Sequence, residues 1–249
     1  MARNRFVFRR RCRVPKTVAI VQSNYIPWKG YFDMIRSVDE FVLYDDVQYT
    51  RRDWRNRNRI KTPQGTQWLT IPVDVKGKYL QAIKDTKISD ASWAKTHWRT
   101  LGHCYAKAPF FKDLNDILER TYAHSQSEFL SDINRQWIEV ICGILGIKTR
   151  VTQSMDYRLT ADDPSARLLE ICLQAGANVY LSGPAARAYL NESLFHEAGV
   201  QVRYMDYGGY PEYQQLYPPF EHAVSVLDLL LMTGQEAPRL LERQCKLAA

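Results

Sequence analysis

Two short stretches of the sequence carry charged side chains that are suited to chemistry on a small molecule. Lys29 and Gly30 end a polar segment, Gln22 to Gly30, that follows a β-branched run, and Asp45 and Asp46 end a second apolar run. An ammonium group neutralises an anion, and adjacent carboxylates bind Mg²⁺ or orient an amine. We therefore expect Lys29, Asp45 and Asp46 to be catalytic, with the two aspartates as the candidate Mg²⁺ ligands. The alternative for the aspartates is a turn and helix cap.

A row of arginines follows between Arg51 and Lys61. In an extended chain Arg55, Arg57 and Arg59 lie on one face at steps of ~6.6 Å, which suits a polyanion because each guanidinium can grip phosphate with two hydrogen bonds. The opposite face then carries Trp54, Asn56, Asn58 and Ile60. Pro63-Gln64-Gly65 predicts a turn before a returning strand, so this segment indicates an anion-binding hairpin. A charged edge that simply faces solvent is the alternative.

Three further features place polar or aromatic groups near the same site. His97 falls on a predicted helix, where it is either a packed or surface residue or an acid or base that reaches the crevice. Ser182 and Gly183 repeat the opening arrangement of a strand, a small polar turn and a helix. The segment from Tyr207 to Phe220 is rich in tyrosine, proline and glycine, and it either contacts a base or sugar ring or packs as a plug over the sheet.

The elements that must position these residues alternate between strands and helices. Apolar strands are expected at about 17–21, 40–44, 149–154, 178–181 and 200–205, with helical patterns between them. This alternation predicts an α/β fold with an open, mostly parallel Rossmann-like sheet, interrupted by a β-hairpin at about 52–73 and a helical insertion at about 92–146. Such sheets bind ligands at the carboxyl ends of their strands, where the stretch after Val21 falls.

Charge and composition limit the classes of binding partner that we expect for the chain. Its 249 residues include 34 basic and 27 acidic side chains, and the whole excess of seven lies in residues 1–16, which contain no acidic residue. We read 1–16 as a disordered basic extension, with an arm for nucleic acid or a membrane surface, or an organelle presequence, as the alternatives. Residues 17–249 are expected to form a single domain, and we do not expect nucleic acid as its partner. No apolar run reaches the length of a transmembrane helix. The five scattered cysteines fit a reduced, cytoplasmic setting.

Several familiar catalytic motifs are absent from the sequence. There is no G-x-G-x-x-G, no G-x-x-x-x-G-K-[ST] and no G-x-S-x-G, and the five histidines show no metal-ligand spacing. Neither a common dinucleotide site, nor a P-loop, nor a hydrolase triad is therefore supported.

The motifs along the chain resemble the WbqC-like family. The matching positions are Gln22, Tyr25, Pro27, Trp28, Gly30 and Tyr31; Tyr44 to Gln48; Arg52, Trp54 and Asn56 to Ile60; Trp68 to Val73; Tyr180 to Ala185; Pro211, Tyr213 and Gln215; and Ser225 to Leu230. One departure is Ser23, where the family more often has proline. The resemblance runs in order from about Lys16 to Gly234. The basic extension lies outside it.

The resemblance implies a role in bacterial polysaccharide or O-antigen biosynthesis. We expect an enzyme that binds a phosphate-bearing substrate, such as ATP or a nucleotide sugar, and transfers an acyl or aminoacyl group. The candidate cofactors are ATP and Mg²⁺. A nucleotidylyltransferase-like enzyme and a non-catalytic nucleotide-sugar binding protein are the alternatives. With the residues and the resemblance combined, the candidate substrate-binding residues are Gln22, Tyr25, Gly30, Gln48, Arg52, Trp54, Asn56, Arg57, Asn58, Arg59, Ser182, Gly183, Tyr213 and Gln215.

Overall fold

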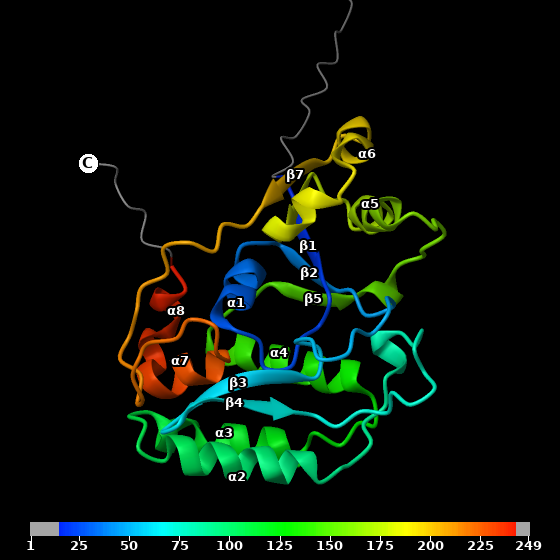
Figure 1. Cartoon of the computed structure of the whole chain (residues 1–249). Helices are drawn as coiled ribbons and strands as arrows, with labels where there is room; N and C mark the ends of the chain where they lie inside the picture. The colour runs from blue at the N-terminus through cyan, green and yellow to red at the C-terminus, as the bar shows by residue number, and fades with distance from the viewer. Residues whose placement is uncertain (1–14, 243–249) are drawn as a thin grey trace, which may run out of the picture.

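The fold is taken from a computed structural model that describes residues 15–242 (Figure 1). Most of the predicted basic extension therefore lies outside the described residues. Lys16, assigned to that extension, belongs instead to the fold: its Nζ donates hydrogen bonds to Glu40 at 2.6 Å and to the Ala175 carbonyl at 2.8 Å. Glu40 is buried, and a buried carboxylate needs a paired charge, which the Lys16 ammonium group supplies.

The centre of the molecule is a five-stranded parallel sheet in the order β5-β2-β1-β6-β7. The predicted α/β fold with a parallel Rossmann-like sheet is confirmed. The strands are β1 (Thr17–Val21), β2 (Glu40–Leu43), β5 (Arg150–Gln153), β6 (Val179–Ser182) and β7 (Gln201–Tyr204).

Both faces of the sheet are covered, which is why its central strands are apolar throughout. Ala19 and Phe41 belong to a core shared with α1 (Lys29–Arg36) and α4 (Leu130–Ile144). Val18 and Ile20 belong to a second core, shared with α5 (Pro164–Gln174) and α6 (Glu192–Glu197). The chain therefore winds along one face of the sheet and returns along the other.

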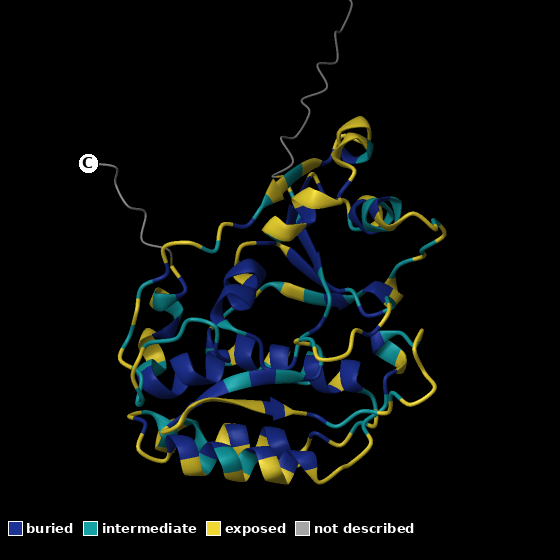
Figure 2. Cartoon of the chain, viewed as in Figure 1, coloured by how far each residue is buried: buried dark blue, intermediate teal, exposed yellow. Residues whose placement is uncertain are grey.

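A second layer lies below the sheet in Figure 1. It contains the antiparallel hairpin of β3 (Arg57–Thr62) and β4 (Gly65–Thr70), which lies between α4 and α7 (Val226–Thr233) on one side and α2 (Trp93–Tyr105) and α3 (Phe111–Ala123) on the other. Figure 2 shows β3 largely buried and β4 largely exposed. The remaining short elements are η1 (Ile83–Asp85), η2 (Ser154–Asp156), η3 (Pro184–Ala188), η4 (Gly234–Glu236) and α8 (Ala237–Leu240).

The strand order places a topological switch point beside β1. From β1 the chain builds outward to β2 and β5 on one side, and it then builds β6 and β7 on the other. In open α/β sheets this is where ligands bind, outside the carboxyl ends of the strands. Within residues 15–242 no helix combines the length and the apolar content needed to cross a bilayer.

Candidate functional site

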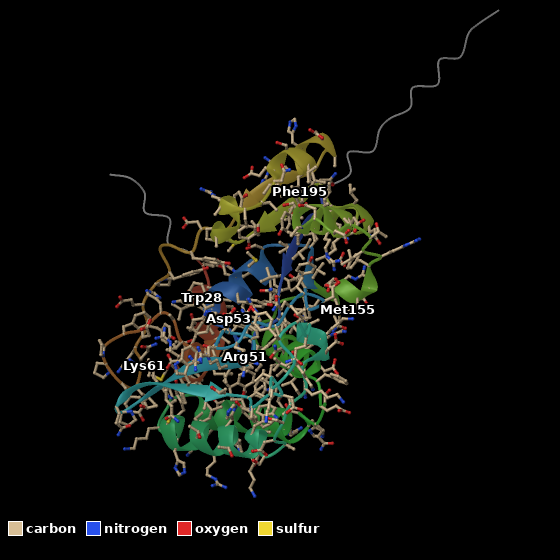
Figure 3. The ribbon with its side chains drawn as sticks, turned by 45° about the vertical axis from the view of Figure 1, so that its right-hand side comes forward. Trp28, Arg51, Asp53, Lys61, Met155 and Phe195 are labelled. Carbon is tan, nitrogen blue, oxygen red and sulfur yellow. The ribbon has the colours of Figure 1, made fainter. Side chains whose placement is uncertain are left out.

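A cavity of about 210 Å³ opens beyond the carboxyl end of β1. Three segments far apart in the sequence form it: the turn between β1 and α1, the hairpin with the residues before it, and the residues before α7. Trp28 and Asp53, labelled in Figure 3, belong to the first two of these segments. The lining residues are Asn24, Pro27, Trp28, Trp54, Asn58 and Ala223.

Hydrogen bonds fix the turn between β1 and α1 against the hairpin. Tyr25 N donates to the Trp54 carbonyl at 3.2 Å, and Asn58 Nδ2 donates to the carbonyls of Ile26 at 3.0 Å and Tyr25 at 3.2 Å. Ile26 has a φ of 36°, a left-handed conformation that a β-branched residue rarely adopts. A strained residue persists only where its surroundings hold it, and such residues cluster at functional sites. The Asn58 amide supplies part of that restraint.

The arginine row has the arrangement that the alternation predicts. Arg57 and Arg59 lie on the half-exposed face of β3, while Asn56, Asn58 and Ile60 are buried on the other face. The Arg57 guanidinium carbon lies 4.1 Å from the centre of the Trp68 ring, and that of Arg59 lies 5.8 Å from the same ring. Both Nε atoms are buried without a hydrogen-bond partner.

Trp54 does not lie on the face that the alternation predicts. It was expected beside Asn56 and Asn58, but its ring lies 5.9 Å from the Arg59 guanidinium and 5.2 Å from the Trp68 ring. The reason is that β3 begins only at Arg57, so the alternation of an extended strand does not reach back to Trp54. Trp54 and Trp68 thus form an exposed aromatic pair beside the arginines, 38% and 40% exposed.

Arg55 connects the row to the turn. One of its Nη atoms donates to Asn24 Oδ1, the other lies 3.5 Å from Asp53 Oδ2, and its Nε is buried without a partner. Asn56, in contrast, uses its amide nitrogen to bind the Ile71 carbonyl at 2.8 Å inside the hairpin. The structure therefore brings Arg55 to the cavity edge and gives Asn56 a place in the hairpin interior.

The two aspartates after β2 point to different partners. Asp45 is fully buried; its carboxylate accepts hydrogen bonds from Ser23 N at 2.8 Å and from Ser131 Oγ, and burial raises its pKa. Asp46 pairs with Arg167 of α5 at 2.8 Å. The two carboxylates therefore do not converge, because Asp45 is hydrogen-bonded in the interior and Asp46 forms an ion pair with Arg167. Within residues 15–242 no cluster of three or more His, Cys, Asp or Glu side chains is placed to hold a metal ion.

His97 lies inside an aromatic core and not in the cavity. Its Nδ1 is 2.9 Å from the Tyr25 hydroxyl, its Nε2 is 3.2 Å from the Thr70 carbonyl, and burial lowers its pKa to about 4. Tyr25, a candidate substrate-binding residue, is completely buried and also lies 3.0 Å from the Tyr122 hydroxyl. Neither side chain reaches the solvent-facing crevice, since the helix α2 that carries His97 packs under the hairpin.

Lys29 is enclosed by the segment that follows β7. Its Nζ donates to the Pro211 carbonyl at 3.1 Å and lies 5.3 to 5.7 Å from the centres of three aromatic rings, those of Tyr210, Tyr213 and Phe220. Burial lowers its pKa to about 8, although nearby acidic groups act in the opposite direction. The Lys29 ammonium group is thus enclosed by a carbonyl oxygen and three aromatic rings. Here the tyrosine-rich segment packs as a plug, one of its two predicted alternatives.

Asp228 is a functional candidate that the site prediction did not include. This buried residue of α7 accepts hydrogen bonds from Tyr105 at 2.8 Å, Tyr213 at 2.7 Å and Gln215 at 2.9 Å. Two of the predicted substrate-binding residues, Tyr213 and Gln215, therefore bind Asp228. A lone acid inside the otherwise apolar run from Val226 to Met232 was the available sequence signal.

The remaining candidates are spread around the end of the sheet. Tyr31 donates a hydrogen bond to the Gln22 carbonyl at 3.1 Å, and Gln48 donates to the Tyr79 carbonyl at 2.9 Å. Ser182, at the end of β6, donates to the Tyr180 hydroxyl at 3.3 Å. Three other candidates are notable for their backbone positions: Gly30 lies under the Trp28 ring, Arg52 has a φ of 59°, and Gly183 directly precedes η3.

Comparisons with known proteins match most of the chain. The model of the WbqC-like protein family matches residues 22–240. A protein of Mycobacterium tuberculosis (strain ATCC 25618 / H37Rv), described as uncharacterized protein Rv1507c, is 53% identical over 231 residues, which cover 93% of this chain and 99% of that protein. No solved structure matches the chain.

Proposed function

The chain belongs to the WbqC-like protein family, and from this premise we propose that it binds a phosphate-bearing small molecule, such as ATP or a nucleotide sugar, at the cavity beyond β1. One observation carries the proposal. The guanidinium groups of Arg55, Arg57 and Arg59 lie next to the lining residues Trp54 and Asn58, and within residues 15–242 only Arg55 has a carboxylate oxygen within 4.0 Å, that of Asp53. Guanidinium groups without a carboxylate partner can bind an anion, and phosphate oxygens accept their hydrogen bonds in pairs.

The size and walls of the cavity favour a ring in its interior. Its volume of about 210 Å³ is below the ~300–1,000 Å³ of sites that enclose a whole drug-sized ligand. Trp28 and Trp54 offer flat apolar surfaces on which a base or sugar ring stacks. In our proposal the ring enters the cavity, and the phosphates remain outside against the arginine row.

Transfer of an acyl or aminoacyl group in glycan or natural-product assembly is the catalytic part of the proposal. Family membership supports it as context, while the predicted catalytic residues Asp45 and His97 are buried away from the cavity. Nucleotidyl transfer and binding without chemistry are the competing functions. Incubating the protein with ATP, Mg²⁺ and an amino acid tests aminoacyl transfer, which releases pyrophosphate and then AMP. A parallel incubation with a sugar phosphate in place of the amino acid tests nucleotidyl transfer, which releases pyrophosphate and no AMP, and binding alone releases neither product.

Arg57→Ala tests the binding proposal. We expect binding of ATP or UDP-glucose, measured by isothermal titration calorimetry, to weaken by about 1.5–3 kcal/mol, the usual contribution of a hydrogen bond to a charged group. Arg120→Ala on α3 is the matched control, because its side chain is 75% exposed and its ion-pair partner, Asp116, is 78% exposed. Equal affinity of the Arg57 variant and the unaltered protein would remove the arginine row from the site.

A further inference from the structure

An apolar tip projects from the protein between the hairpin and α2. Tyr79 is 76% exposed and Leu80 is 80% exposed, about twice the exposure of Trp54 and Trp68. We call residues 76–80, Lys76-Gly-Lys-Tyr-Leu80, the 76–80 loop. Two adjacent, almost fully exposed apolar side chains are a feature that marks an interaction surface, because water solvates them at a cost.

The 76–80 loop is held in place by hydrogen bonds to its own turns and to the segment after β2. Lys78 N donates to the Val75 carbonyl and Gln81 N to the Lys78 carbonyl, both at 3.3 Å, which makes two successive turns. Gln48 Nε2 donates to the Tyr79 carbonyl at 2.9 Å, and Tyr49 N donates to the Gln81 carbonyl at 2.9 Å. The backbone therefore presents Tyr79 and Leu80 outward in a fixed conformation, so docking them needs little additional ordering.

Cations surround this tip. Lys76 and Lys78 are exposed within the loop, and Arg51 reaches it through a hydrogen bond from its guanidinium to the Val75 carbonyl. Within residues 15–242 the one carboxylate that pairs with these cations is that of Asp74, 4.0 Å from Lys78 Nζ, and both partners are about half exposed. Such a pair is strongly screened by water, so it leaves the loop with a net positive charge.

We propose that the 76–80 loop docks the protein on an anionic lipid surface. Tyr79 and Leu80 enter the headgroup region, where amphipathic tyrosine rings are enriched in membrane proteins. Lys76, Lys78 and Arg51 contact lipid phosphates. Charge complementarity selects this partner, because a convex apolar tip ringed by cations matches a negatively charged interface. None of these residues lines the cavity beyond β1, so this proposal and the proposed nucleotide site stand or fall separately.

Co-sedimentation of the full chain with lipid vesicles tests the proposal. We expect binding to vesicles of phosphatidylcholine with phosphatidylglycerol, and none to phosphatidylcholine alone. Lys76→Ser with Lys78→Ser should weaken binding about thirty-fold, from ~1 kcal/mol for each basic side chain at the surface. Tyr79→Ser with Leu80→Ser should weaken it by at least about ten-fold, because the apolar anchor is lost.

The matched control removes a tyrosine and a leucine from elsewhere on the surface. Tyr189 is 71% exposed and Leu173 is 52% exposed, so Tyr189→Ser with Leu173→Ser should bind vesicles as the unaltered protein does. The basic residues 1–16 are the same in every variant. Equal binding of all variants would assign lipid attraction to other basic residues and overturn the proposal, as would failure to bind anionic vesicles or equal binding to neutral ones.

Discussion

At the scale of single residues, the buried aromatic core explains why His97 is neutral. Its Nε2 faces the Thr70 carbonyl, which only accepts, so Nε2 carries the proton and Nδ1 accepts from the Tyr25 hydroxyl. The Tyr25 oxygen in turn accepts from Tyr122. The neutral ring thus completes a chain of hydrogen bonds between α2, α3 and the turn after β1. A protonated ring would donate from Nδ1 to the Tyr25 oxygen instead, and it would place a buried positive charge among the aromatic side chains.

His97→Asn should make the free energy of unfolding depend less on pH between 7 and 4. The folded protein holds the pKa of His97 near 4, below its usual value of about 6.5, because burial disfavours the charged ring. The unfolded chain therefore takes up the proton first. Stability from this group is complete above pH 6.5 and falls as the pH drops toward 4, by on the order of 3 kcal/mol. Urea unfolding from pH 7 to 4 measures this, and parallel curves for both proteins would contradict it.

At the scale of elements, the turn between β1 and α1 is shaped by close packing of Trp28 on Gly30. A Cβ atom added at Gly30 would lie 2.3 Å from the Trp28 ring, much closer than any real contact. The centre of the Trp28 ring lies 5.2 Å from that of Tyr207 and 5.9 Å from that of Tyr210, so the indole has little freedom to move. Gly30 is therefore needed for the entry of α1 beneath an indole that lines the cavity.

Gly30→Ala should destabilise the fold by about 1–3 kcal/mol, the usual cost of overpacking. Trp28→Ala removes the clashing ring, so the alanine at 30 should cost much less in the double variant. A double-mutant cycle of unfolding free energies measures this coupling. If the two effects simply add, Gly30 acts through something other than the Trp28 ring.

At the scale of the whole molecule, α7 ties the second layer to the sheet through one buried carboxylate. Asp228 joins α2 through Tyr105 and the segment after β7 through Tyr213 and Gln215. That segment also encloses Lys29, which begins α1. The charges and hydroxyls of four regions thus meet in one interior network, and burial raises the pKa of Asp228 within it.

Asp228→Ala should lower the free energy of unfolding by about 3–5 kcal/mol, because three donors lose their buried charged acceptor. Asp116→Ala is the control, since this aspartate is 78% exposed on α3 and should change stability by less than about 0.5 kcal/mol. Urea unfolding at neutral pH compares them. A loss at Asp228 no larger than that at Asp116 would show that the network contributes little to stability.

The sequence by itself determined the features that depend on near neighbours in the chain. The five parallel strands and the turn that begins at Pro63 follow from local patterns of apolar and turn residues. The alternation also placed Arg57 and Arg59 together on one face of β3. Family motifs along the chain pointed to the WbqC-like family, and the match over residues 22–240 confirms it.

Only the tertiary structure decided which polar side chains lie at the cavity and which bind partners in the interior of the fold. Asp45, His97 and Lys29 have the residue types of a catalytic site, but Ser131, Thr70 and Pro211, each more than 25 residues away, bind them in the interior. A charged side chain can be buried only where such distant partners bind it, and the spacing of residues along the sequence does not predict those partners. The cavity itself arises from three separated segments, which the folded chain alone brings together.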